Sequence, residues 1–185
     1  QQGRLLRDPI RELVSDYLYG HIVGDLGAQH FWMLVQSRLT EPVLPVSIRS
    51  ELHGIADGAG LAYRDVLLMN TVPDQIALAH TLPDASLLPR LFSPSLPVTG
   101  SLLLCTSFVS WGSATNEGTL LLGHSLESAE GDVLRDRLVL VVRQPKSTGA
   151  TVGMGLAGSV GTWAGMNEQS LAVTLASSPS VDVEL

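Results

Sequence analysis

The chain has 185 residues, of which 45% are hydrophobic and 16% charged, with a formal net charge of −7. This composition is typical of one globular domain with a core and excludes a disordered chain. The eleven Lys and Arg residues are scattered, so we expect no nucleic-acid partner. No apolar run approaches the roughly 20 residues of a membrane helix, so we expect no membrane span.

Residues 1–80 are predicted to form a helical region. The pair Asp8-Pro9 precedes apolar positions at helical spacing, which predicts a helix that starts near Pro9 with Asp8 as its cap. Three more helices are predicted, over residues 30–39, 47–57 and 63–80, the last interrupted at Pro73. The chain begins at Gln1 rather than Met, which suggests a removed upstream segment such as an export signal, and localisation stays open between cytoplasm and export.

Residues 81–104 are predicted to be a linker, because four prolines interrupt them. From Cys105 onward the apolar pattern changes to a period of two, which is typical of strands. We expect a hairpin across the turn 113–118 and an antiparallel meander through residues 105–185, with later strands near residues 137–144, 150–156 and 171–177. The predicted fold class is α+β, with helices packed against one face of a sheet.

Such a meander would leave one face uncovered. The apolar strand residues expected on that face are Leu120, Leu122, Val139 and Val141. A sheet of about five strands is stable only when its apolar face is packed against something. We therefore expect a second chain, a C-terminal segment or another copy of the chain to cover it.

Cys105 is the only cysteine, so the chain has no intrachain disulfide. A lone cysteine is most often a small buried hydrophobic residue. Cys105, however, lies where the linker meets a strand, and the hydroxyl residues Thr106 and Ser107 follow it. The preceding Pro-rich segment is suited to chain scission. Cys105 is therefore the leading candidate nucleophile.

Three other patterns in the sequence bear on cofactor binding, serine-hydrolase chemistry and metal binding. "GMGLAG" at 153–158 has the spacing of a dinucleotide loop, but no helix follows it, so a tight turn or close backbone packing is favoured. "GHSLE" lacks one glycine of a serine-hydrolase elbow, which makes Ser125 a weaker nucleophile candidate. No Cys/His grouping has metal-site spacing, and we expect neither a metal nor an organic cofactor.

Several blocks together resemble a known family. They are "CTSFVSW" at 105–111, "NEG" at 116–118, "LLLGHSLE" at 120–127, "WAGMNEQSLAVTL" at 163–175 and, upstream, "ELHGIADGAGLAYRDVLLMN" at 51–70. Taken together in chain order, these blocks resemble the N-terminal-nucleophile (Ntn) hydrolases of the penicillin acyltransferase type, with choloylglycine hydrolases as more distant relatives. The resemblance covers roughly residues 47–177.

The resemblance implies an αββα sandwich and a self-processing precursor. Residues 1–80 would be a helical pro-region, and residues 105–185 the antiparallel part of the core. The Leu104–Cys105 bond would be cut, and the freed amine of Cys105 would act as base for its own thiol on a linear amide substrate. Supporting catalytic positions would be Glu127 and Ser177.

Three further residues are candidates for substrate binding, namely Trp111, His124 and Trp163. The two tryptophans are as readily explained as core residues. The chain also departs from the family pattern, because Leu104 stands where a glycine is common before the nucleophile, and Glu127 where an aspartate is usual. The positions that differ from the family pattern at 124, 125, 127 and 176–177 favour the rival hypothesis, a catalytically impaired domain that serves as a binding or assembly module.

Overall fold

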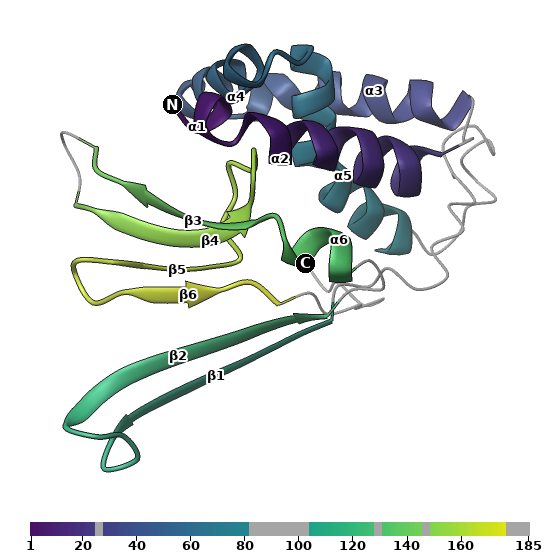
Figure 1. Cartoon of the computed structure of the whole chain (residues 1–185). Coiled ribbons are helices and arrows are strands. Elements are labelled where there is room, and N and C mark those ends of the chain that lie inside the picture. Colours follow the sequence, from purple (N-terminus) through teal and green to yellow (C-terminus); the bar gives the residue numbers. More distant parts are fainter. Residues whose placement is uncertain (25–27, 82–103, 128–130, 146–148, 177–185) are drawn as a thin grey trace. The chain divides into compact units, whose positions relative to one another are not determined.

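The computed structural model describes residues 1–24, 28–81, 104–127, 131–145 and 149–176 (Figure 1). The described residues form two compact units. The helical unit contains the described residues up to Thr81 together with the short segment Leu156–Val160. The β unit contains the other described residues from Leu104 to Gly155 and from Gly161 to Ala176. Over the described residues, the chain therefore passes from the helical unit to the β unit, returns to the helical unit for Leu156–Val160, and then re-enters the β unit.

The helical unit consists of five α-helices and two helical segments of other types within the described residues. In chain order they are α1 (Gln2–Leu5), α2 (Arg7–Glu12), the π-helix η1 (Leu13–Val23), α3 (Ala28–Thr40), the 3-10 helix η2 (Glu41–Val43), α4 (Val46–Ala59) and α5 (Tyr63–Thr81). The predicted helical region is thus confirmed over the part of it that the structure describes.

The core of the helical unit is aliphatic. Eight residues supply fully or almost fully buried side chains: Ile10, Leu13, Leu18, Leu52, Ile55, Val66, Leu67 and Leu68. Burying each such side chain contributes roughly 1.5–3 kcal/mol to folding. The buried hydroxyls of Ser37 and Thr71 satisfy each other at 2.7 Å across α3 and α5, and the Gln75 amide donates to Ser37 at 2.9 Å. This polar network fixes how α3 meets α5.

Two predicted helix features are corrected. The first long helix begins at Arg7, with Leu6 at its N-cap, so Pro9 falls inside the first turn and Asp8 makes no cap hydrogen bond. A proline is tolerated there because the first N–H groups of a helix have no partner to lose. Helix α5 continues through Pro73 without interruption. The buried residues Val66 to Leu68 and Val72 anchor the turns of α5 that precede Pro73.

The β unit contains two antiparallel arrangements. Strands β1 (Leu104–Gly112) and β2 (Gly118–Glu127) form a hairpin. After the short helix α6 (Gly131–Arg135), a second sheet has the order β3 (Leu138–Arg143), β4 (Thr151–Leu156), β5 (Ala164–Asn167) and β6 (Ala172–Thr174). The β4–β5 and β5–β6 pairs are antiparallel. The α+β class is confirmed.

The prediction of a single continuous meander was wrong. Among the described strands, β2 pairs only with β1, and strands β3 to β6 form a separate sheet. Strand β5 and helix α6 were not predicted. Asn167 ends β5, and its Oδ1 accepts hydrogen bonds from the N–H groups of Gln169 and Leu171 in the turn that follows. The left-handed residue of that turn is Ser170, with φ 66°.

The glycines of 153–158 serve packing and turning, as expected. Gly153 pairs with Gly165 across β4 and β5, and a Cβ on Gly153 would collide with the side chain of Thr162. Gly158 has φ +81°, which an L side chain rarely adopts. The segment thus runs as a strand into a turn, and a dinucleotide loop would instead need the start of a helix.

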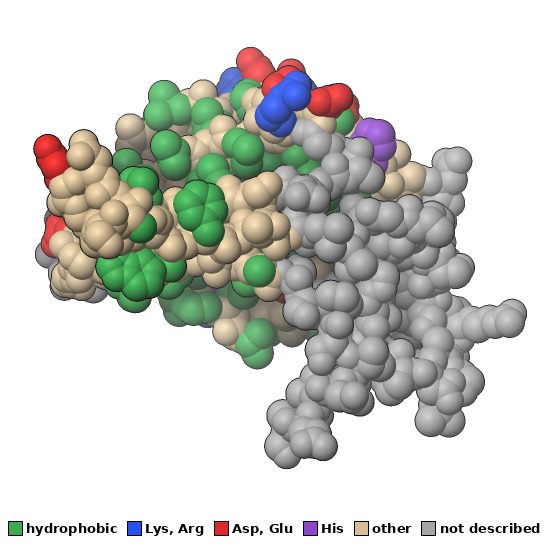
Figure 2. All heavy atoms as spheres, turned by 90° about the horizontal axis from the view of Figure 1, so that it is seen from below, with side chains coloured by type: hydrophobic (Ala, Val, Ile, Leu, Met, Phe, Trp, Pro, Cys, Tyr) green, Lys and Arg blue, Asp and Glu red, His purple; other side chains and the backbone are tan. Residues whose placement is uncertain are grey.

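Apolar strand residues remain exposed in the β unit. On the hairpin, Phe108 is 62% and Leu121 52% exposed. On strand β3, Val139 and Val141 were expected on the uncovered face, but both are half-buried. The exposed residues of this strand are instead Leu138, Leu140 and Val142. Figure 2 shows hydrophobic side chains spread over one face of the molecule, with charged groups at its margins.

Candidate active site on the hairpin

The register of the hairpin decides which residues share a face with Cys105. Cys105 pairs with Leu126, and Ser107 pairs with His124. Side chains alternate between faces along a strand, and paired residues lie on the same face. Cys105, Ser107 and His124 therefore belong to one face of the hairpin, next to its open end.

Ser107 and His124 make direct contact. The Ser107 Oγ lies 3.0 Å from Nδ1 of His124, within hydrogen-bond distance. His124 is half-buried, and its Nε2 is buried without a hydrogen-bond partner among the described residues. A buried imidazole nitrogen with no partner is able to take or give a proton if a suitable group is brought to it.

Cys105 itself is half-buried. It is the second residue of β1, so its backbone is held in an extended conformation by pairing with Leu126. An extended segment fixed by a neighbouring strand presents its side chains at defined positions. The thiol is the strongest nucleophile that the side chains of this hairpin offer at neutral pH.

The remaining predicted catalytic residues are placed only in part. Leu104 pairs with Glu127, so Glu127 occupies a register position on the face opposite Cys105, and the side chains of both residues lie outside the described part. Ser177 lies outside the described residues. Ser125 is exposed near the C-terminal end of β2, where it pairs with Thr106 of β1.

The three predicted substrate-binding residues come from different sheets. Trp111 is at the turn end of β1 and is 61% exposed, whereas His124 lies near the open end of the hairpin. Trp163 precedes β5 in the second sheet, where its N–H donates to the carbonyl of Met154 and its carbonyl accepts from Leu175. Strand pairing puts His124 on the face of Cys105, and alternation along β1 puts Trp111 on the same face at the turn end. Trp163 lies next to the other sheet.

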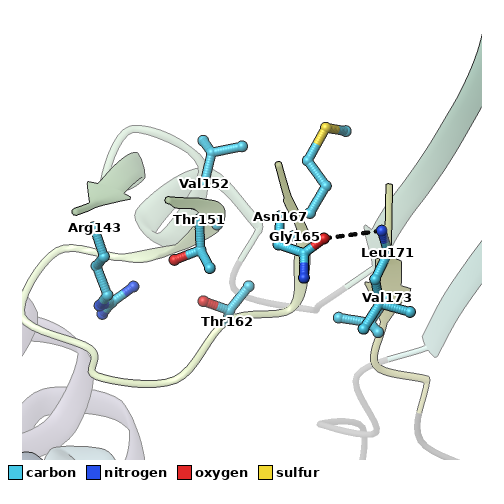
Figure 3. A pocket seen from close by; sticks show the side chains of 10 residues that line it. Arg143, Thr151, Val152, Thr162, Gly165, Asn167, Leu171 and Val173 are labelled. Carbon is cyan, nitrogen blue, oxygen red and sulfur yellow. Dashed lines mark hydrogen bonds between the residues drawn. The ribbon is translucent and has the colours of Figure 1, made fainter. Parts of the chain in front are cut away.

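The second sheet carries a shallow hollow of about 250 Å³. Figure 3 shows its lining, in which Arg143, Thr151, Thr162 and Asn167 supply the polar groups among apolar neighbours such as Val173. Asn167 is held by its hydrogen bond from the N–H of Leu171, drawn as a dashed line. The lining residues all come from the second sheet and its connections, so this hollow is a feature separate from the hairpin face.

Within the described ranges, no three His, Cys, Asp or Glu side chains gather in a group that could hold a metal ion. None of the described helices is both long and apolar enough to cross a bilayer.

The Ser107–His124 pair was missed by sequence reasoning, and the register of the hairpin explains why. Counting outward along both strands from Gly112 opposite Gly118 would place Ser107 opposite Gly123. A register shift between Ser110 and Gly112 moves the partner of Ser107 to His124. An irregularity of this kind cannot be read from the alternation of residue types alone.

Comparisons with known proteins leave the family open. No family model matches the chain, and no solved structure matches it. An uncharacterized protein of the archaeon Archaeoglobus fulgidus is 29% identical over 153 residues, which is 78% of this chain and 24% of that protein. The chain thus spans about a quarter of the length of this relative.

Proposed function

We propose that the chain is part of a self-processing cysteine hydrolase or acyltransferase of the Ntn type, acting on a linear amide bond of a small molecule or peptide. The observation that carries the proposal is the position of Cys105 at the start of β1, on the hairpin face that also bears the hydrogen-bonded Ser107 and His124. Pairing of Cys105 with Leu126 would hold such a nucleophile in place after it becomes a chain terminus.

Activation requires one cut. The Cys105 thiol attacks the carbonyl carbon of Leu104, the bond to the Cys105 nitrogen breaks, and that nitrogen takes the proton from the thiol. Water then hydrolyses the resulting thioester, which gives a carboxylate at Leu104 and restores the thiol. Cys105 is now the first residue of its chain, and its free amine, with a pKa of about 8 in model compounds, lies beside the thiol.

Turnover repeats the same chemistry on a substrate. The amine takes the thiol proton while sulfur attacks the substrate carbonyl, and the leaving amine receives that proton as the C–N bond breaks. Water or an acceptor amine then releases the acyl group, so hydrolysis and transfer differ only in the second nucleophile. Glu127 and Ser177 would support the terminal amine and the oxyanion, as the resemblance implies, while His124 would line the site together with Trp111 and Trp163.

The exposed apolar strands support a further part of this proposal, namely that more polypeptide completes the sandwich. Both faces of the hairpin carry exposed apolar side chains, with Phe108 and Leu121 on one face and Val109 on the other. An isolated two-stranded hairpin is marginally stable in water. The αββα architecture, in which sheets stack between helical layers, would cover both faces with a C-terminal segment, a second chain or another copy.

The rival is a binding or assembly module that keeps the fold without the chemistry, and the positions that differ from the family pattern at 124, 125, 127 and 176–177 favour it. The rate at which Cys105 is alkylated distinguishes the enzyme from the binding module. At pH 7, iodoacetamide should modify Cys105 at least about tenfold faster than free cysteine if the thiol is activated. A rate no higher than that of free cysteine would support the module. A serine esterase would instead lose activity with Ser125→Ala and keep it with Cys105→Ala.

A further inference from the structure

One side chain of the helical unit binds a segment that comes much later in the chain. Asn70 of α5 donates from Nδ2 to the carbonyl of Gly158 at 3.0 Å, and its Oδ1 accepts from the N–H of Val160 at 2.9 Å. The same Nδ2 also donates to the carbonyl of Val66 at 2.9 Å, which fixes the orientation of the amide on its own helix. The Asn70 side chain therefore binds one backbone carbonyl and one backbone N–H of this segment, as the backbone of a neighbouring strand would.

The bound segment fits its position closely. Ala157 is fully buried, and Gly158 is buried with φ +81°. A Cβ on Gly158 would lie 3.0 Å from Cε of Met69 and 3.1 Å from Cγ1 of Ile10. Only glycine combines this backbone conformation with so close an approach to both side chains.

These contacts place the turn Leu156–Val160 in the helical unit, although its neighbours in sequence belong to the β unit. Asn70 precedes residues 82–103, and the turn follows them. We infer that the helical unit is a binding site for the turn Leu156–Val160, with Asn70 as the residue that determines its fit, and that this site holds the two fragments together when the chain is cut between them. The inference rests on the proposed function only for the place of the natural cut.

The test makes the cut independently of Cys105. A Cys105→Ala chain receives a recognition site for a specific protease within residues 82–103, is cut, and is passed over a gel-filtration column. The two fragments should elute together in native buffer and separate in denaturant. Separation in native buffer at micromolar concentration would overturn the inference, while leaving the proposed self-scission untouched.

Two variants probe the contact from opposite sides. Asn70→Ala removes two hydrogen bonds to the turn and should weaken association of the cut fragments about 10- to 100-fold. Gly158→Ala leaves the sequence of the helical fragment unchanged and should weaken association at least about tenfold, because the new Cβ meets Met69 and Ile10. The matched control is Asp74→Ala, an exposed position on the same helix, which should leave association unchanged.

Folding of the helical fragment is checked by its circular dichroism, so that a misfolded variant is recognised before its affinity is compared. Gly158→Ala keeps the inference falsifiable if Asn70→Ala fails to fold. Equal affinity of the Gly158→Ala and Asp74→Ala proteins would refute a role for this turn. Failure of the unaltered chain to cut itself would count against the proposed function only, since the added protease makes the cut here.

Discussion

Ser107 and His124 face each other across the hairpin, with Oγ and Nδ1 3.0 Å apart, on the face that carries Cys105. The contact orients the imidazole and leaves its Nε2 buried without a partner among the described residues. A hydrogen bond of this kind contributes about 0.5–1.5 kcal/mol. It therefore favours the ring orientation that makes the contact by about 2- to 13-fold.

Ser107→Ala should slow scission of newly made chains about 3- to 10-fold, because it removes the hydrogen bond that orients His124, whose imidazole we propose relays the thiol proton to the Cys105 nitrogen. The measurement is the rate at which fragments appear on a denaturing gel after synthesis. The matched control is Thr106→Ala, one residue earlier and on the opposite face, which pairs with Ser125. If both variants slow scission equally, the Ser107–His124 contact has no role at the site.

Helix α4 contains two glycines at which substitution by alanine should change the free energy of unfolding in opposite directions. A Cβ on Gly54 would meet no other group within 4 Å, so Gly54→Ala should raise the free energy of unfolding by about 0.5–1 kcal/mol through higher helix propensity. A Cβ on Gly58 would lie 2.8 Å from the backbone of Gly3 and of Arg4, so Gly58→Ala should lower it by about 1–3 kcal/mol. Urea unfolding followed by circular dichroism measures both. Stabilisation by both substitutions would show that α1 does not pack against α4 at these glycines.

Tyr19 gives the helical unit a defined alkaline response. Burial, together with the 2.7 Å hydrogen bond from its hydroxyl to Asp65, raises the pKa of Tyr19 to about 12 from 10.0. The protonated form is therefore favoured in the folded state, and the stability that this confers is complete below pH 10 and is lost as the pH rises from 10 towards 12. Because the side chain is half-buried, the contribution is about 1 kcal/mol rather than the full value of the shift.

Tyr19→Phe should consequently lower the free energy of unfolding by about 1 kcal/mol at pH 8, and the difference from the unaltered protein should disappear near pH 12. Urea titrations at both pH values measure it. Asp65→Asn serves as the partner variant and should reduce the same pH dependence. A difference that persists unchanged at pH 12 would contradict this account of Tyr19.

Local features of the fold were readable from the sequence, and long-range pairing was not. The helical spacing of Ile10, Leu13 and Val14 and the alternation after Cys105 predict elements that the structure confirms. The division of the strands into two sheets was missed, because alternation predicts a strand without naming its partner. The contact of Asn70 with Gly158 and Val160 joins residues about ninety positions apart, and no local pattern indicates it.

The candidate site was predicted to a similar extent. Cys105 stood out because it is the only thiol and begins an alternating segment, and both facts follow from the sequence. That Cys105 shares a face with His124, and that Glu127 instead pairs with Leu104, depends on the register of the hairpin. A shift of one residue in that register would exchange the two faces, so the composition of the site could not be read from residue types alone.

The mass and N-terminal sequence of the fragments formed by the complete gene product test the central claim most directly. The account predicts two fragments that meet between Leu104 and Cys105, with cysteine as the first residue of the second. It also predicts that Cys105→Ala stays intact under the same conditions. An unaltered protein that remains a single chain after prolonged incubation, or one cut at another bond in both forms, would contradict it.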